Sequence, residues 1–128
     1  MATEFTVRLE HRPGTLAHVS GVLGDANVNI NAFQGTICEG MGIIQFVPDA
    51  PDHAARVLDK AGIPYTTREV LLVNILNEPG TLGDVALVMA DVGINIDAVY
   101  VTLEGQVVLG VDDVSGAIQV AAGMAVLR

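Results

Sequence analysis

The chain contains one segment twice, and this repetition limits the folds that it can adopt. Residues 12–32 align with residues 78–98 without a gap, at a constant offset of 66, and ten of the 21 aligned positions are identical. In the first copy the identical residues are Pro13, Gly14, Thr15, Leu16, Val19, Val22, Asp25, Asn29, Ile30 and Ala32. Because such a repeat indicates two copies of one structural unit, we predict two modules, at residues 1–69 and 70–128.

Each copy has the pattern of a β-α-β-β-α-β unit, the ferredoxin-like arrangement. Alternating or β-branched segments predict strands, and apolar residues at intervals of three and four predict helices. In the first copy the predicted strands are Glu4–Glu10, Val28–Cys38, Gly42–Val47 and Pro64–Val70, and the predicted helices are Thr15–Ala26 and Pro51–Ala61. In the second copy the strands are Leu71–Asn77, Ile94–Leu103, Gln106–Val111 and a short last strand within 124–128, and the helices are Thr81–Val92 and Val114–Ala122.

These elements predict an α+β fold class with two ferredoxin-like βαββαβ modules, whose antiparallel sheets carry helices on one face. The buried stripes of the first helix in each copy are predicted at Leu16, Val19, Leu23 and Ala26, and at Leu82, Val85, Met89 and Val92. A unit of about 60 residues has only a marginal core of its own. We therefore expect the two modules to pack together.

The composition excludes several classes of function. Six Lys and Arg residues against 15 Asp and Glu give a formal net charge of −9, which argues against binding to nucleic acid phosphates. No run of 18 or more apolar residues is present, so we expect no membrane span. The N-terminal segment lacks a basic region followed by an apolar core, and the single cysteine, Cys38, cannot form an internal disulfide. Together these features predict a cytoplasmic protein.

A Pro-Gly turn separates the first strand of each copy from its first helix. The two turns are Pro13-Gly14, followed by Thr15, and Pro79-Gly80, followed by Thr81. Proline suits the first turn of a helix, and glycine allows unusual backbone angles and the close approach of another molecule. Threonine is predicted to cap the free N–H groups of the helix, whose partial positive charge also attracts a carboxylate. The turn therefore predicts a small anion site, although the same residues often only end a strand and start a helix.

A second shared feature is the Asn at the start of the strand that follows the helix, Asn29 in "NVNINA" and Asn95 in "GINIDA". Its side chain both donates and accepts hydrogen bonds, which suits the ammonium and carboxylate of an amino acid. Asn also commonly closes a helix–strand connection, and the residues alone leave both roles open.

The pattern "NEPGTL…GINI" and its repeat resemble the ACT domain family, whose small βαββαβ modules bind amino acids and regulate metabolism. The resemblance covers essentially the whole chain. It implies that a ligand is held between two modules, by the Pro-Gly loop of one and the Asn of the other. One implied site consists of Asn77, Pro79, Gly80, Thr81 and Leu82, facing Asn29 and Ile30. The reciprocal site consists of His11, Pro13, Gly14, Thr15 and Leu16, facing Asn95 and Ile96.

The first copy departs from the family pattern because His11 replaces the Asn found at Asn77. We therefore rank the Asn77 loop as the better site. The other histidines, His18 and His53, lack the spacing of metal ligands, so no metal site and no cofactor are predicted. The acids Asp49, Asp52, Asp112 and Asp113 are interpreted as helix caps rather than as catalytic pairs.

The sequence thus predicts a non-catalytic regulator that binds an amino acid between its modules and signals by changed packing or oligomeric state. We expect a homodimer whose output passes to another protein, such as a metabolic enzyme, or to the oligomeric state itself. One alternative is a structural or interaction subunit that docks on an enzyme without binding a ligand. Another is a small ferredoxin-like enzyme that uses His11, although no base–nucleophile pair is visible. The identity of the amino acid is not predicted.

Overall fold

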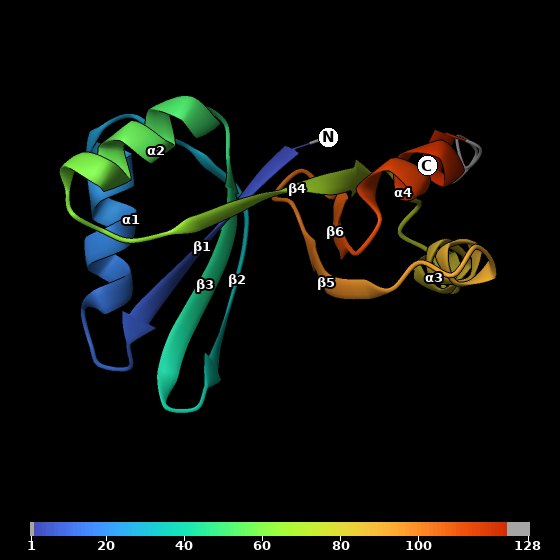
Figure 1. Ribbon diagram of the computed structural model, residues 1–128, viewed down its shortest axis with the longest axis horizontal. Coiled ribbons are helices and arrows are strands. Elements are labelled where there is room, and N and C mark those ends of the chain that lie inside the picture. The colour runs from blue at the N-terminus through green and yellow to red at the C-terminus, as the bar shows by residue number, and fades with distance from the viewer. Residues whose placement is uncertain (1, 123–128) are drawn as a thin grey trace. The chain divides into compact units, whose positions relative to one another are not determined.

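The computed structural model describes residues 2–122, which form two units, Thr3–Arg68 and a second unit that begins at Glu69 and includes Ala2. The elements of the first unit are β1 (Ala2–Glu10), α1 (Thr15–Asp25), β2 (Ile30–Cys38), β3 (Met41–Pro48), α2 (Pro51–Lys60) and β4 (Thr66–Val73). Their strand order is β2-β3-β1-β4, with β3 antiparallel to both β1 and β2. This is the predicted ferredoxin-like arrangement, and Figure 1 shows its strands and both helices.

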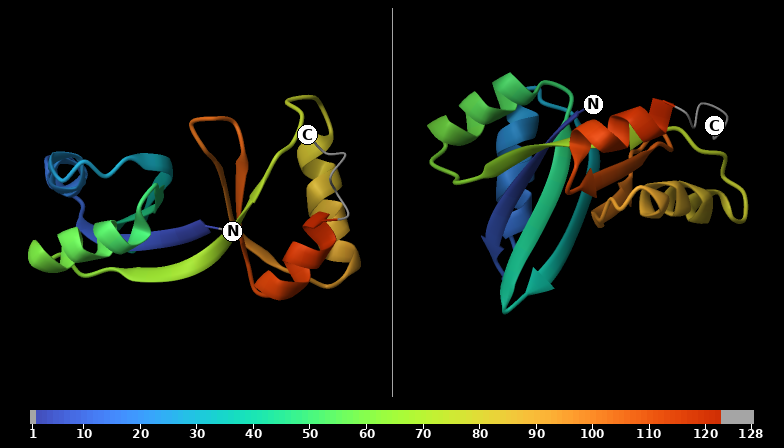
Figure 2. Two further views of the ribbon diagram at one scale, coloured as in Figure 1. Left: turned by 90° about the horizontal axis from the view of Figure 1, so that it is seen from above. Right: turned by 45° about the vertical axis from the view of Figure 1, so that its right-hand side comes forward.

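The second unit repeats this plan with α3 (Thr81–Asp91), β5 (Ile96–Val101), β6 (Val107–Val111) and α4 (Val114–Ala122). Strand β6 lies between β4 and β5 and is antiparallel to both. Figure 2 shows α3 and α4 from two further directions. The predicted last strand of this copy lies in residues 124–128, outside the described residues.

The core of each unit lies between its helices and one face of its strands. In the first unit β1, β3, α1 and α2 contribute Phe5, Val7, Val19, Leu23, Ile44, Phe46, Ala54 and Leu58. The rings of Phe5 and Phe46 stack there with their centroids 5.4 Å apart. In the second unit the corresponding core contains Leu71, Val73, Val85, Met89, Val107, Leu109, Val111 and Ala117. Both helices of each unit therefore cover the same face of the strands.

One boundary between the copies differs from the prediction. We predicted two strands, Pro64–Val70 and Leu71–Asn77, but the structure has the single strand β4, Thr66–Val73. No glycine or proline interrupts the sequence of β4, so nothing stops the strand between the copies. Strand β4 is thus both the last strand of the first unit and the first strand of the second.

The helix stripes were only partly predicted correctly. Val19, Leu23, Val85 and Met89 are buried as expected. Leu16 and Leu82 are instead 51% and 49% exposed, and Val92 is 55% exposed. Each of these three residues lies at an end of its helix, where the chain turns away from the core. The exposed leucines lie two residues after the glycines of the Pro-Gly turns.

A polar row crosses the first unit on the strand face opposite its helices. The carboxylate of Glu4, which is almost fully buried, accepts a hydrogen bond from Arg68 Nε at 2.8 Å. Gln45 Nε2 also donates to Glu4 at 3.3 Å, and Gln34 Nε2 donates to Gln45 Oε1 at 2.6 Å. The row therefore links β4, β1, β3 and β2 of this unit through their side chains.

No helix within residues 2–122 is both long and apolar enough to cross a membrane.

Candidate functional site

The backbone of the two Pro-Gly loops is nearly identical. Gly14 has φ 94° and ψ −15°, and Gly80 has φ 92° and ψ −14°, a left-handed conformation that favours glycine. Each glycine is the residue immediately before its helix, and neither α1 nor α3 has a side-chain cap. The N–H groups in the first turn of both helices therefore donate no hydrogen bond to a capping side chain.

The threonines do not cap the helices, in contrast to the prediction. Thr15 Oγ1 donates to the carbonyl oxygens of Glu10 at 2.9 Å and Arg12 at 3.1 Å. Thr81 Oγ1 donates to those of Leu76 at 2.7 Å and Glu78 at 3.0 Å. Because each hydroxyl donates to carbonyls three and five residues before it, it fixes the shape of the loop and does not cap the helix N–H groups.

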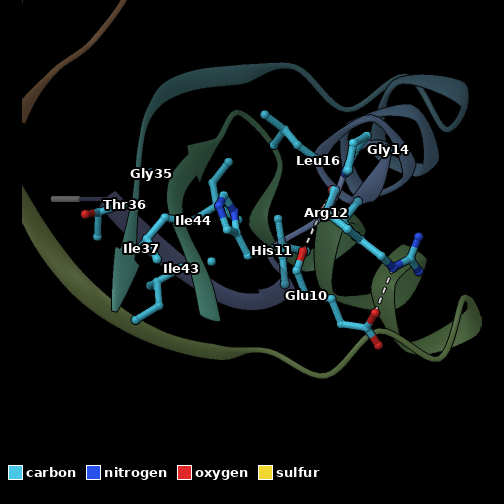
Figure 3. Close-up of a pocket in the computed structure, with 14 residues that line it drawn as sticks. Glu10, His11, Arg12, Gly14, Leu16, Gly35, Thr36, Ile37, Ile43 and Ile44 are labelled. Carbon is cyan, nitrogen blue, oxygen red and sulfur yellow. Dashed lines mark hydrogen bonds and ion pairs between the residues drawn. The ribbon is translucent and has the colours of Figure 1, made fainter. Parts of the chain in front are cut away.

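A hollow of about 480 Å³ lies beside the first loop. All five residues predicted for this loop line it: His11, Pro13, Gly14, Thr15 and Leu16. The rest of the wall comes from the end of β1, from Arg12 in the loop and from the β2–β3 hairpin. The strand and hairpin residues are Leu9, Glu10, Gly35, Thr36, Ile37, Gly42, Ile43 and Ile44. Figure 3 shows His11 turned towards the isoleucines, whereas Glu10 and Arg12 extend together in another direction.

A hollow of about 440 Å³ occupies the same place in the second unit. Of the residues predicted for this loop, Asn77, Gly80, Thr81 and Leu82 line it, and Pro79 does not. The other lining residues are Ile75, Leu76, Glu78, Gly83, Val101, Gly105 and Val107. At the repeat offset, Asn77 stands for His11, Glu78 for Arg12 and Val101 for Gly35. The two hollows therefore lie at equivalent positions of the repeat but are lined by different side chains.

The two asparagines that the copies share, Asn29 and Asn95, lie elsewhere in their units. Asn29 N donates to Asp49 Oδ1 at 3.1 Å, and Asp49 N donates back to Asn29 O at 2.9 Å. Asn95 and Asp112 make the same two bonds at 3.0 and 3.2 Å, and Asn95 Nδ2 also donates to Asp112 Oδ2 at 3.1 Å. We call this reciprocal pair the Asn–Asp clasp, and it joins the residue before β2 or β5 to the residue after β3 or β6.

The clasp and the hollow of one unit lie at opposite ends of its first helix. Asn29 follows the C-terminal end of α1, whereas Gly14 precedes its N-terminal end, and eleven helical residues span about 16 Å. Figure 1 shows the loop before α1 at the same end of the unit as the tip of the β2–β3 hairpin. Asn29, Ile30, Asn95 and Ile96 accordingly line neither hollow. Their predicted role opposite the loop of the other module stays a prediction.

Three of the four acids interpreted as helix caps do not act as caps. Asp113 does, because its Oδ1 accepts a hydrogen bond from Gly116 N at 3.0 Å. Asp49 and Asp112 belong to the clasps, and Asp52 lies inside the first turn of α2, which has no side-chain cap. The clasp was not predicted because an Asp before a helix is typical of a cap. The Asn that each Asp binds is also distant from it in the sequence.

The clasps also show where the copies differ in length. Asn29 and Asp49 are 20 residues apart, whereas Asn95 and Asp112 are 17 residues apart. The irregularity in strand register near each clasp occurs at the same place in both units. The difference of three residues therefore falls in the hairpins beyond the clasps.

The hairpin tips account for this difference. In the first unit Cys38 pairs with Met41 across a two-residue turn, whereas in the second Thr102 N donates to Gln106 O at 2.8 Å across three residues. Each arm of the β2–β3 hairpin is thus two residues longer than its counterpart, and its loop is one residue shorter. The additional residues of these arms extend the wall of the first hollow.

This hairpin wall was not predicted from the sequence. Its signal was the pair of glycines inside strand-like segments, Gly35 and Gly42, because glycine within a strand often marks a close approach of another group. Gly42 lies in β3 between Leu9 and Ile37. A Cβ atom at Gly42 would lie 3.4 Å from Leu9 O, so the position has little room for a side chain.

The clasps should contribute measurably to stability. We expect Asp112→Ala to lower the free energy of unfolding by about 1–2 kcal/mol, because it removes two hydrogen bonds to a carboxylate at an exposed position. Asp49→Ala removes one such bond and should cost about 1 kcal/mol. Urea denaturation monitored by circular dichroism measures both values. Glu104→Ala, in the exposed β5–β6 loop, serves as the control, and a larger loss for Asp49→Ala than for Asp112→Ala would contradict the assignment.

Residues 2–122 contain no group of three or more His, Cys, Asp or Glu side chains arranged to hold a metal ion. Cys38 is a free, exposed thiol at the tip of the β2–β3 hairpin. His53 Nε2 lies 2.9 Å from the carbonyl oxygen of Ala26 and thereby connects α2 to the end of α1. These side chains thus have structural or solvent-exposed positions.

Comparisons with known proteins agree with the repeated fold. The sequence profile of the family described as "ACT domain pair" matches residues 1–120. No curated protein matches the chain. The profile match confirms the resemblance to the ACT domain family that the Pro-Gly and Asn motifs indicated.

Solved structures with the same fold cover almost the whole chain. A protein from Bacteroides thetaiotaomicron is 24% identical and superposes with a TM-score of 0.88, covering 96% of this chain and 88% of that chain. The ligand-free regulatory subunit of aspartate kinase from Thermus thermophilus is 15% identical, with a TM-score of 0.72 and coverage of 98% and 91%. The same subunit from Thermus flavus is 15% identical, with a TM-score of 0.66 and coverage of 95% and 90%. With its profile match over both copies and this shared architecture, the chain belongs to the ACT domain pair family.

Proposed function

We propose that this protein is a non-catalytic regulator that binds a free amino acid at the hollows beside its Pro-Gly loops. The observation that carries the proposal is the occurrence of the same hollow, at the same loop, in both units. A surface depression that arose by chance would not be expected at the same loop of both copies. Both hollows also fall within the size range of small-molecule sites, roughly 300–1,000 Å³.

The chemistry of the loops suits the main-chain groups of an amino acid. The first turns of α1 and α3 start without a side-chain cap, so their N–H groups and the helix dipole favour a carboxylate. The ammonium group needs acceptors, which the family resemblance assigns to the Asn of a neighbouring module. We therefore propose that Asn95 and Ile96 complete the His11 site and that Asn29 and Ile30 complete the Asn77 site.

The regulatory output is proposed to act on another protein. The structurally similar Thermus thermophilus protein is a regulatory subunit of aspartate kinase, and by analogy this chain would associate with a metabolic enzyme in the cytoplasm and act as a homodimer. Ligand binding alters such an assembly only as far as it favours one arrangement over another.

Thermal denaturation with each of the twenty amino acids tests the proposal. A ligand that binds only the folded protein, at 100 times its dissociation constant, should add about 2.7 kcal/mol of stability. Asn29→Ala and Asn95→Ala should each reduce the increment, and Asn74→Ala, an exposed asparagine outside both hollows, should not. Because Asn95→Ala also removes a clasp bond, the ligand increment and not the melting temperature is compared.

An interaction subunit without a ligand is the second candidate. The observation that favours it is the exposed apolar surface of α3, where Leu87 is 60% exposed, continuing to Val92 just after the helix. In this case no amino acid would shift the denaturation midpoint, and that result would contradict the amino-acid proposal. Light scattering on the same samples gives the mass of the assembly and tests the homodimer.

A further inference from the structure

The wall of the first hollow is dominated by aliphatic side chains. Leu9, Leu16, Ile37 and Ile44 reach it from four different elements, β1, α1, β2 and β3. Leu16 and Ile37 are 51% and 50% exposed, although they flank this hollow. An apolar group that covers such water-exposed apolar surface lowers the free energy of the system.

The two charged residues of this wall neutralise each other. Arg12 Nε lies 2.7 Å from Glu10 Oε2, and both side chains are mostly exposed. Figure 3 shows this pair on one side of the loop, away from the isoleucines. A charged group that entered among the aliphatic side chains would lose water without gaining an opposite charge, which is unfavourable.

The floor of the hollow is kept free of side chains by two glycines on neighbouring strands. Gly35 pairs with Ile44 in the β2–β3 ladder, and Gly42 pairs with Ile37. The second unit differs at this point, because Val101 occupies the position of Gly35 and pairs with Val107. The first hollow therefore has room at a point where its counterpart carries a valine.

The second hollow also differs in charge and polarity. Asn77 replaces His11, and the carboxylate of Glu78 replaces the guanidinium of Arg12. Among the described residues, 2–122, Glu78 has no ion-pair partner. All amino acids share the same main-chain groups, but the two hollows thus present different surfaces to the side chain of such a ligand.

From these differences we infer that the hollow of the first unit selects amino acids with an apolar side chain and rejects those with a charged one. The inference rests on the proposed function, because it assigns a ligand class to one of the two proposed sites. The apolar side chain would lie against the isoleucines over the glycine floor. Selectivity would then arise from Gly35 and from the neutralised pair of Glu10 and Arg12.

The test measures binding of Leu, Met, Phe, Lys and Glu to the full chain by isothermal titration calorimetry. We expect Leu, Met or Phe to bind at least ten times more tightly than Lys and Glu. Gly35→Val, which introduces the residue found in the second unit, should weaken that binding at least tenfold. A Cβ at Gly35 would lie 3.6 Å from Ile43 O, an ordinary contact, so this variant is expected to fold.

Two further variants keep the test decisive. Ile37→Lys places a charge on the half-exposed wall and should weaken apolar ligands as well, even if Gly35→Val does not fold. Gly21→Val is the matched control, because Gly21 lies on α1 outside the hollow with no atom within 4 Å of an added Cβ. Its affinity should equal that of the wild type.

Failure of the inference is distinguishable from failure of the proposed function. If Lys or Glu binds and Gly35→Val abolishes that binding, the first hollow is an amino-acid site of another class and the inference is overturned. If an apolar amino acid binds but neither Gly35→Val nor Ile37→Lys affects it, its side chain lies elsewhere and the inference is again overturned. If no amino acid binds, the proposed function itself fails, and the inference with it.

Discussion

Replacing Leu23 with alanine is expected to lower the free energy of unfolding by about 2–5 kcal/mol, the usual range for a buried leucine. Leu23 lies on the buried side of α1 with no exposed surface and packs in the core with Phe5, Phe46 and Leu58. The change removes apolar contacts and leaves a cavity that the close-packed neighbours fill only in part. Equilibrium denaturation in urea, monitored by circular dichroism, measures the loss.

The control for this variant is Leu16→Ala, on the same helix. The helical pattern predicted both leucines in one buried stripe, but the structure exposes 51% of Leu16. We therefore expect Leu16→Ala to cost less than about 1 kcal/mol, as is common for partly exposed positions. Similar losses for the two variants would show that the stripe continues to Leu16 and would contradict the position of α1 relative to its strands.

Replacing Arg68 with alanine is expected to be the second most damaging change, at about 2–4 kcal/mol. The carboxylate of Glu4 is 1% exposed and accepts the Arg68 Nε–H at 2.8 Å, so the variant leaves a buried charge without this cation. Breaking a fully buried pair costs about 3–5 kcal/mol, and exposure of about a third of Arg68 (34%) reduces the expected loss. The urea midpoint at neutral pH gives the value.

Arg12→Ala provides the comparison for the same type of residue. Arg12 pairs with Glu10 at 2.7 Å, but the two side chains are 64% and 70% exposed. Exposed ion pairs contribute only about 0–1 kcal/mol, because water screens the charges and both side chains lose conformational freedom. Equal losses for Arg12→Ala and Arg68→Ala would mean that burial of Glu4 does not determine the strength of its ion pair.

The repeat predicted most of the fold because helix and strand periodicities are local properties of the sequence. The beginnings of α1, α2, α3 and α4 all lie at the predicted residues. The boundary between the copies was not predicted, since the end of one strand and the start of the next look the same when no turn residue separates them. The partial exposure of Leu16 also escaped prediction, because periodicity indicates a helix face but not where the core ends.

The candidate site was predicted in part. Both Pro-Gly loops line hollows, as the shared glycine and threonine suggested, whereas Thr15 and Thr81 bond to backbone carbonyls that precede the helix and do not cap it. The Asn–Asp clasp and the hairpin walls depend on residues 17 to 20 positions apart and on neighbouring strands. Such partners are set by strand pairing, which a single sequence without an alignment does not specify.

The two additional residues in each arm of the β2–β3 hairpin have a consequence for how the copies could diverge. A strand alternates its faces every two residues, so an insertion of one residue in one arm would exchange the inner and outer faces beyond it. Two residues in both arms extend the hairpin and keep every side chain on its original face. After a gene duplication, lengthening of this kind changes the wall of the first hollow while the clasp and the core keep their register.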